Sequence, residues 1–385
     1  MGWGERATRA ATGTTGIRVL LGVLLTAVAL KLAAEIFFFG TRVRCWDTML
    51  LSGTSVFAVA VALALSLPRR FEHALTELRV HGALPLTAAE TVEIKDDLER
   101  SGTRMVARAA VIVGVLVLGG FLYVLVPQLL AVWQDPAQPR GVVYAVVGFF
   151  GFLTLVCAVC GFVGGAFLGR VASYGLLARR LSRPGSRLTL LPGHYDGANG
   201  LAPLGSLYLY QAFLVMFPIL WLAAWWLIIP YYNTSACGAG IDNPYLSWRV
   251  PLLVLWITSV VFLYLAFVRP VLQLKRRITA ERDHLARVRL PEIRAEIDVI
   301  RANLASSPYS TDDHAALQAR LDTLAREHWD IQHMPTWPMD RATMRQYFSV
   351  NAAGTVAPLV LKGYDIASGG SLLSPGVTRL LSTFS

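Results

Sequence analysis

Residues 109–133 read AAVIVGVLVLGGFLYVLVPQLLAVW, a run that contains no charged side chain. A helix needs roughly 20 consecutive apolar residues to cross the ~30 Å hydrocarbon core of a bilayer. This run is long enough, and Trp133 at its end has the amphipathic ring that prefers a membrane interface. The stretch therefore predicts a membrane-spanning helix and excludes a soluble protein with a single buried core.

Further apolar stretches of similar length lie on either side of this one. Hydrophobic residues make up 55% of the chain and charged residues 16%, against about 25% charged in a soluble domain. We therefore predict an all-α integral membrane protein with six transmembrane helices and a cytoplasmic helical hairpin. The predicted bundle covers residues 1–270, with spans at 17–39, 48–68, 107–133, 141–169, 207–230 and 249–268, and with long loops at 69–104 and 170–206.

Basic residues indicate which loops face the cytoplasm. Loops 69–104 and 170–206 and the segment after residue 268 are rich in Arg and Lys, whereas residues 231–248 contain neither. Cytoplasmic loops carry an excess of these residues, so both termini are predicted to lie in the cytoplasm, at a plasma (inner) membrane. The same rule accounts for the net charge of +10 without a nucleic-acid partner. The great excess of Arg over Lys is typical of a bacterium with GC-rich codons.

The four cysteines fall into two pairs. Cys45 and Cys237 lie on predicted outer loops, where oxidation is permitted, and we predict a disulfide between them. Cys157 and Cys160 lie inside the fourth span, and their C-x-x-C spacing is that of redox and metal motifs. Free Cys also behaves as a small buried hydrophobe, and we favour this packing interpretation.

Small residues recur at every fourth position of the fourth span, at Cys157, Gly161, Gly165 and Gly169. Residues four apart share a helix face, and small side chains let a neighbouring backbone approach closely. The pattern predicts a helix packing stripe, which lies either inside the bundle or between the subunits of a homo-oligomer.

Two charges fall inside the first span. Lys31 and Glu35 are four residues apart, so they share a helix face and can pair. A charge at membrane depth usually faces a cavity, a partner or a pathway. The alternative is a lysine that extends toward the interface and is held there by its glutamate. We predict an intramembrane charge pair.

Residues 271–333 are predicted to form a cytoplasmic antiparallel helical hairpin, in which Pro291 starts a second helix after the one that leaves the membrane. Apolar residues at 4-3-4 spacing form two stripes separated by a turn near Pro308, and such stripes pack into a seam. The stripes are Ile293, Ile297, Ile300 and Leu304, followed by Leu317, Leu321, Leu324, His328 and Ile331. Residues 334–385 are predicted to be partly interfacial or mobile.

The most unusual polar stretch is LPGHYDGANGL at residues 191–201. It places His194, Asp196 and Asn199 close together among glycines, and His194 and Asp196 have the side chains to bind a metal or move a proton. We favour the alternative of a tight loop in which Asp196 and Asn199 satisfy backbone amides. No resident metal or cofactor is predicted.

This loop resembles an H-P-D-x-x-G-G-L pattern of uncharacterised bacterial multi-spanning membrane proteins. Tyr195 stands where that pattern has proline, and Asn199 stands where it has the first of the paired glycines. The resemblance covers this loop alone and implies no activity.

Three functions remain open. The first is an oligomeric, channel- or pore-like protein whose cytoplasmic helices serve assembly and gating. The second is a membrane-anchored sensor or effector that docks a cytoplasmic partner. The third is an interfacial enzyme that uses His194 and Asp196. The chain lacks a P-loop, an H-E-x-x-H motif and a G-x-S-x-G motif, so we favour the functions without catalysis. The expected partners are the lipid bilayer, further copies of the chain and a cytoplasmic protein.

Overall fold

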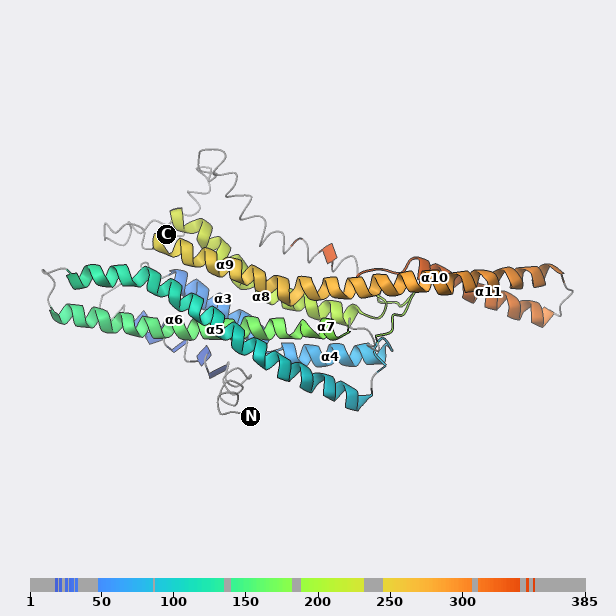
Figure 1. Cartoon of the computed structure of the whole chain (residues 1–385), viewed down its shortest axis with the longest axis horizontal. Helices are drawn as coiled ribbons and strands as arrows, with labels where there is room; N and C mark the ends of the chain where they lie inside the picture. The colour runs from blue at the N-terminus through green and yellow to red at the C-terminus, as the bar shows by residue number, and fades with distance from the viewer. Residues whose placement is uncertain are drawn as a thin grey trace, which may run out of the picture.

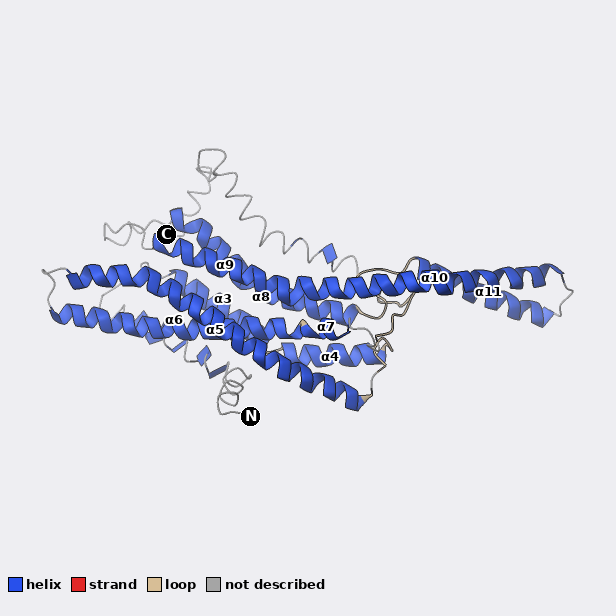
Figure 2. Ribbon diagram, viewed as in Figure 1, coloured by secondary structure: helices blue, strands red, loops and turns tan. Residues whose placement is uncertain are grey.

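The computed structural model describes most of the chain between residues 48 and 339 and single short pieces outside it. Every regular element among these residues is a helix (Figure 2). The described residues are 18–19, 21–22, 25–26, 28–30, 32–33, 48–85, 87–134, 140–181, 188–231, 245–306, 311–339, 344–345 and 349.

The molecule is elongated, with a helical bundle from which one helical hairpin projects (Figure 1). We call the end of the bundle nearest this projection the hairpin end. In chain order the elements are α3 (Thr48–Ala64), α4 (Leu67–Val80), α5 (Ala88–Gln134), α6 (Arg140–Tyr174), α7 (Leu176–Leu181), α8 (Ala202–Ile228), η2 (Ile229–Tyr231), η4 (Leu246–Trp248), α9 (Arg249–Leu263), η5 (Tyr264–Val268), α10 (Arg269–Ser306) and α11 (Thr311–Gln332).

The bundle is that of a helical membrane protein. Within the described residues, five helical stretches are long and apolar enough to cross a membrane: Leu51–Val80, Ala89–Ala131, Val147–Leu181, Ala202–Ile228 and Leu246–Ala305. Each of them overlaps one of the second to sixth predicted spans, with different bounds. The first predicted span, 17–39, lies largely outside the described residues, so five spans are found where the hydropathy pattern predicts six.

Two of these helices continue far beyond the apolar core. α5 has 47 residues, or about 70 Å at 1.5 Å per residue, so its first turns, within the predicted loop 69–104, lie outside the apolar stretch. α10 is a single helix of 38 residues with Pro291 inside it, so the predicted second helix start at Pro291 is wrong. A proline in a helix removes one backbone hydrogen bond, and the surrounding turns of α10 are long enough to tolerate that loss.

The backbones of α5 and α6 pack in direct contact. A Cβ atom added at Gly161 would lie 2.9 Å from Cα of Gly114, and one at Gly165 would lie 2.6 Å from Cα of Ala110. Gly169 lies equally close to Val106. The two backbones therefore touch along an antiparallel contact that only glycine permits.

α10 and α11 form an antiparallel hairpin with a seam of large aliphatic residues. Ile293 and Leu324 are fully buried between the two helices, with Ile297, Ile300 and Ile331 beside them. Arg289 bonds to Glu327 at 2.9 Å and Arg320 to Glu296 at 2.7 Å, at the rim of this seam. His328 lies at the rim as well, where it accepts a hydrogen bond from Nε of Arg294 at 3.1 Å.

One uninterrupted helix joins the bundle to the hairpin, because α9, η5 and α10 follow one another without a break. η5 is a π-helical segment in which N–H of Arg269 bonds to the carbonyl of Tyr264. Pro270 has no N–H to offer the carbonyl of Ala266, which explains why the helix widens at this place. Gly175, at the turn between α6 and α7, lies against this segment, since a Cβ there would be 3.0 Å from the Ala266 carbonyl oxygen.

Candidate functional site

A polar cluster lies at the hairpin end of the bundle, and we call it the polar junction: His81, His194, Tyr195, Asp196 and Asn199. His81 is the residue that ends α4, and the other four belong to the loop that precedes α8. Backbone bonds bring these two segments together, because the N–H of Thr189 donates to the carbonyl of Ala83 at 3.0 Å. The junction therefore joins parts of the chain that are far apart in sequence.

Asp196 organises its loop through its carboxylate. Oδ1 accepts the backbone N–H groups of Ala198 at 2.9 Å and Gly200 at 3.0 Å, and Oδ2 accepts that of Ala202 at 3.1 Å. The bond to Ala202 satisfies an amide at the start of α8, where the helix itself supplies no partner. This is the arrangement expected of a tight loop, with Asp196 as its acceptor.

The Asp196 carboxylate is held in its ionised form. Its side chain is only 6% exposed, and burial by itself raises the pKa of the carboxyl. The N–H donors of Ala198, Gly200 and Ala202, together with the His194 side chain, outweigh burial and lower the pKa below its ordinary value of 3.8. A negative charge is therefore fixed beside His194 at neutral pH.

The rings of two histidines and a tyrosine pack against one another beside this carboxylate, at tilted or edge-to-face angles. Nδ1 of His194 lies 3.0 Å from Oδ1 of Asp196, and the ring centroids of His194 and His81 are 4.9 Å apart. The hydroxyl of Tyr195 lies 2.9 Å from Nε2 of His81. Nδ1 of His81 is buried with no hydrogen-bond partner among the described residues. One ligand atom each of His81, His194 and Asp196 lies within 4.8 Å of the other two, so these three side chains are the group that can hold a metal ion.

Asn199 connects the junction to the chain that follows the hairpin. Its backbone has a φ of +59°, and Gly200 next to it has a φ of +84°. Glycine is the usual residue in this left-handed conformation, and Asn is among the few other residues that tolerate it. The sequence predicted that the side chain of Asn199 would satisfy a backbone amide of the loop. It instead donates Nδ2–H to the carbonyl of Pro335 at 2.8 Å.

Residues 334–339 pack against the bundle. Met334 and Met339 are buried, and the carbonyl of Pro338 lies directly against Gly205 at the start of α8. Nζ of Lys275 on α10 lies 4.4 Å from the ring centroid of Trp337. Asp330 of α11 in turn lies against Gly193 of the loop. The return segment thus fixes the base of the hairpin to the polar junction.

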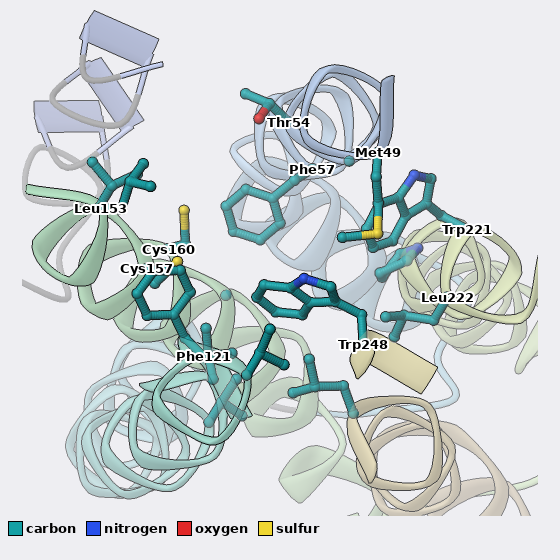
Figure 3. A pocket seen from close by; sticks show the side chains of 18 of the residues that line it. Met49, Thr54, Phe57, Phe121, Leu153, Cys157, Cys160, Trp221, Leu222 and Trp248 are labelled. Atoms are coloured by element: carbon teal, nitrogen blue, oxygen red, sulfur yellow. The ribbon is translucent and has the colours of Figure 1, made fainter. Parts of the chain in front are cut away.

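An apolar cavity of about 590 Å³ forms the second candidate site, within the membrane bundle (Figure 3). Phe57 of α3, Trp221 of α8 and Trp248 of η4 face it, and Cys157 and Cys160 of α6 line the opposite side. Ser52 accepts the indole N–H groups of Trp221 and Trp225, each at 3.0 Å, which fixes these rings. Sites for small molecules are mostly apolar and measure about 300–1,000 Å³.

The site residues predicted from the sequence lie in different parts of the structure. His194, Asp196 and Asn199 meet in the polar junction, and Gly161, Gly165 and Gly169 meet α5. Cys157 and Cys160 line the cavity. Lys31, Glu35, Cys45 and Cys237 lie outside the described residues, so the charge pair and the disulfide stay predictions.

Two parts of the candidate sites could not be predicted from the sequence, namely His81 and the lining of the cavity. His81 is 114 positions from Tyr195, its hydrogen-bond partner, and no local pattern marks it. The cavity residues belong to spans that are apolar throughout, so hydropathy does not distinguish a cavity wall from a lipid-facing side chain.

Comparison with known proteins does not add an assignment. No family model, no curated protein and no solved structure matches the chain. The geometry therefore defines a helical membrane protein with an apolar cavity and a polar junction, and function has to be argued from these two sites.

Proposed function

We propose that the protein is a membrane-anchored sensor, in which a lipid acyl chain occupies the apolar cavity and the hairpin relays its presence to a protein partner outside the membrane. The observation that supports this most is the continuous helix α9–η5–α10. Leu255 and Ser259 of α9 line the cavity, and Ile293 of α10 lies in the hairpin seam. A displacement of the cavity wall can therefore be transmitted along this helix to the hairpin.

The chemistry of the cavity favours an acyl chain as occupant. Its walls are almost entirely hydrocarbon and aromatic, with Thr54, Gln128 and Ser259 as the polar exceptions. An apolar pocket of about 590 Å³ left empty is unfavourable, because the side chains that line it lose van der Waals contacts. Among membrane-spanning helices the molecule that surrounds the protein and matches these walls is lipid.

The π-helical segment is the part of the relay best suited to change. π-helical turns inside α-helices occur often at functional sites. In this chain the segment packs against α8 and against Gly175. A change of register between Tyr264 and Val268 would rotate α10 relative to α9 and so reorient the hairpin.

The hairpin offers an exposed aromatic residue to a partner. Trp329 is 59% exposed and stacks on His333 at a centroid distance of 4.3 Å. Asp322, Arg326 and Asp330 surround a small hollow beside it. Trp and Arg are enriched among residues that dominate the energy of protein interfaces, so we expect the partner to contact this face.

A matched pair of variants tests the proposal. Gly164 lines the cavity next to Phe57, so Gly164→Leu fills part of it, whereas Gly151 on the same helix faces open space. We expect lipid removal to accelerate hydrogen exchange of hairpin amides in the wild type and in Gly151→Leu, and to have little effect in Gly164→Leu. A wild-type hairpin whose exchange ignores lipid removal would contradict the relay.

The finer topology belongs to the same proposal. We propose that residues 17–39 form a further span, which is the first of six in chain order. We also propose that the protein is a homo-oligomer in the inner membrane of a bacterium, with both termini and the hairpin in the cytoplasm. The pore-like function stays a prediction, because the charges that motivate it, Lys31 and Glu35, lie outside the described residues. The enzyme alternative has the polar junction as its site, and His194 lines neither of the two pockets described above.

A further inference from the structure

We propose that His81, His194 and Asp196 bind a divalent transition-metal ion, with Zn²⁺ as the best match. The site is independent of the acyl-chain cavity, because it lies at the hairpin end of the bundle and shares no residue with the cavity wall. A metal there would join the end of α4 to the loop before α8.

The three side chains are of types that bind transition metals. Two imidazoles and one carboxylate, each offering an atom within 4.8 Å of the other two, need only a small adjustment of side chains to surround one ion. Imidazole nitrogen suits Zn²⁺, Cu²⁺, Fe²⁺ and Ni²⁺, whereas Ca²⁺ and Mg²⁺ prefer oxygen ligands. Two histidines and a carboxylate are also the ligand type of zinc sites that keep a fourth position open.

Hydrogen bonds already orient the side chains for binding. Three backbone N–H groups hold the Asp196 carboxylate, and Oδ2 accepts only one of them, so it keeps a free lone pair. Tyr195 occupies Nε2 of His81, which leaves Nδ1 as the nitrogen for a metal. Hydrogen bonds of this kind to the second ring nitrogen fix the tautomer and orientation of metal-binding histidines.

One of the ligand nitrogens has no partner. Nδ1 of His81 is buried and has no hydrogen-bond partner among the described residues. A buried polar atom without a partner is unfavourable, and native proteins contain few of them. His194 is 14% exposed and Asp196 6%, so the group is shielded but retains access for an ion.

The simpler explanation is a His–Asp pair that only stabilises the loop. That explanation accounts for His194 and Asp196, but it gives no role to the unpartnered nitrogen of His81 or to the Tyr195 hydroxyl that orients its ring. The two explanations differ in whether all three side chains and Tyr195 contribute to the binding of one ion.

Zinc titration of the full-length protein separates them. The protein is purified in mild detergent with a tag that contains no histidine, treated with a chelator, and titrated with Zn²⁺ alone by calorimetry. We expect one ion per chain, and a distinctive visible spectrum when Co²⁺ replaces Zn²⁺. His194→Ala and His81→Gln should each weaken binding by about 100-fold or more, because even outer partners of metal ligands are worth 10–100-fold.

Two further variants guard against a trivial loss of folding. Tyr195→Phe removes only the hydroxyl on His81, and it should weaken Zn²⁺ binding by about 10-fold while the metal-free thermal midpoint changes little. His73→Ala removes an exposed histidine of the same helix, α4, and should bind like the wild type. Binding that is equal in the wild type, His194→Ala and Tyr195→Phe, or no stoichiometric binding at all, would overturn the metal site.

Discussion

The α5–α6 pair and the α10–α11 hairpin are both antiparallel helix pairs, yet opposite kinds of residue hold them together. The first uses glycines that bring the backbones into contact, and the second uses buried Ile and Leu with ion pairs at the rim. Lipid tails are as apolar as leucine, so moving aliphatic side chains out of lipid into a seam gives no hydrophobic stabilisation. Close contact between two backbones does stabilise the pair, through van der Waals packing. In water the reverse holds, because apolar burial is the main driving force.

The difference predicts that the two pairs fail in opposite ways. Gly165→Leu should give the largest effect, because even its Cβ would lie 2.6 Å from Cα of Ala110 on α5. Backbone atoms cannot move aside as a flexible side chain can, so we expect the bundle not to assemble, with a loss beyond the 1–3 kcal/mol typical of overpacking. Size-exclusion chromatography and the thermal midpoint in detergent measure this. Gly148→Leu on the same helix meets no atom within 4 Å and should behave normally.

The hairpin should fail when its residues become smaller. Leu324→Ala removes a fully buried side chain from the seam and should destabilise the hairpin by about 3 kcal/mol. The loss should be local, with faster hydrogen exchange of α10 and α11 beyond Pro291 and unchanged exchange in α5 and α6. Thr323→Ala, on the exposed face of α11, is the control. Equal acceleration in the bundle would show that the two regions do not unfold separately.

The junction between the two regions should show an intermediate effect. Asn199→Ala loses the bond to Pro335 and places a side chain that disfavours a φ of +59°, for a cost of about 2 kcal/mol. Asn199→Gly keeps the conformation and should cost about half as much. The rate of proteolysis within residues 334–339 measures how firmly this segment is held against the bundle. Identical behaviour of the two variants would mean that backbone conformation contributes nothing here.

The rim of the hairpin should show the smallest effect. Arg320 donates Nε–H and Nη2–H to Oε1 of Glu296, but both side chains are well exposed. Glu296→Gln should therefore cost about 0.5 kcal/mol at low salt and less as the ionic strength rises. Denaturation of the wild type and the variant at two salt concentrations measures this. A salt-independent loss several times larger would show that the ion pair, and not the aliphatic seam, holds the hairpin.

Sequence reasoning succeeds where one physical requirement dominates. Lipid demands long uncharged helices, so the five spans that the structure contains follow from hydropathy, and the 4-3-4 stripes indicate the hairpin seam. It fails where neighbouring helices decide the outcome. Pro291 has the pattern of a helix start, but packing of Leu290 and Ile293 against α11 keeps α10 continuous.

The candidate sites were predictable only in part. Glycines around Asp196 predict a tight loop, and that local chemistry is found. His81 joins the same site through the tertiary contact of two distant segments, and the cavity depends on how five helices diverge. Neither leaves a periodic signal in the sequence.

The central claim is that occupancy of the membrane cavity changes the position of the hairpin, and a distance measurement tests it most directly. Spin labels at Thr76→Cys on α4 and Ala316→Cys on α11, in a chain whose four native cysteines are replaced, report the position of the hairpin relative to the bundle. Phosphatidylcholine is then added back to delipidated protein in detergent. We predict a shift of the distance distribution on lipid addition, and its loss in Gly164→Leu but not in Gly151→Leu. Identical distributions with and without lipid in the cysteine-replaced chain that keeps both Gly164 and Gly151 would contradict the account.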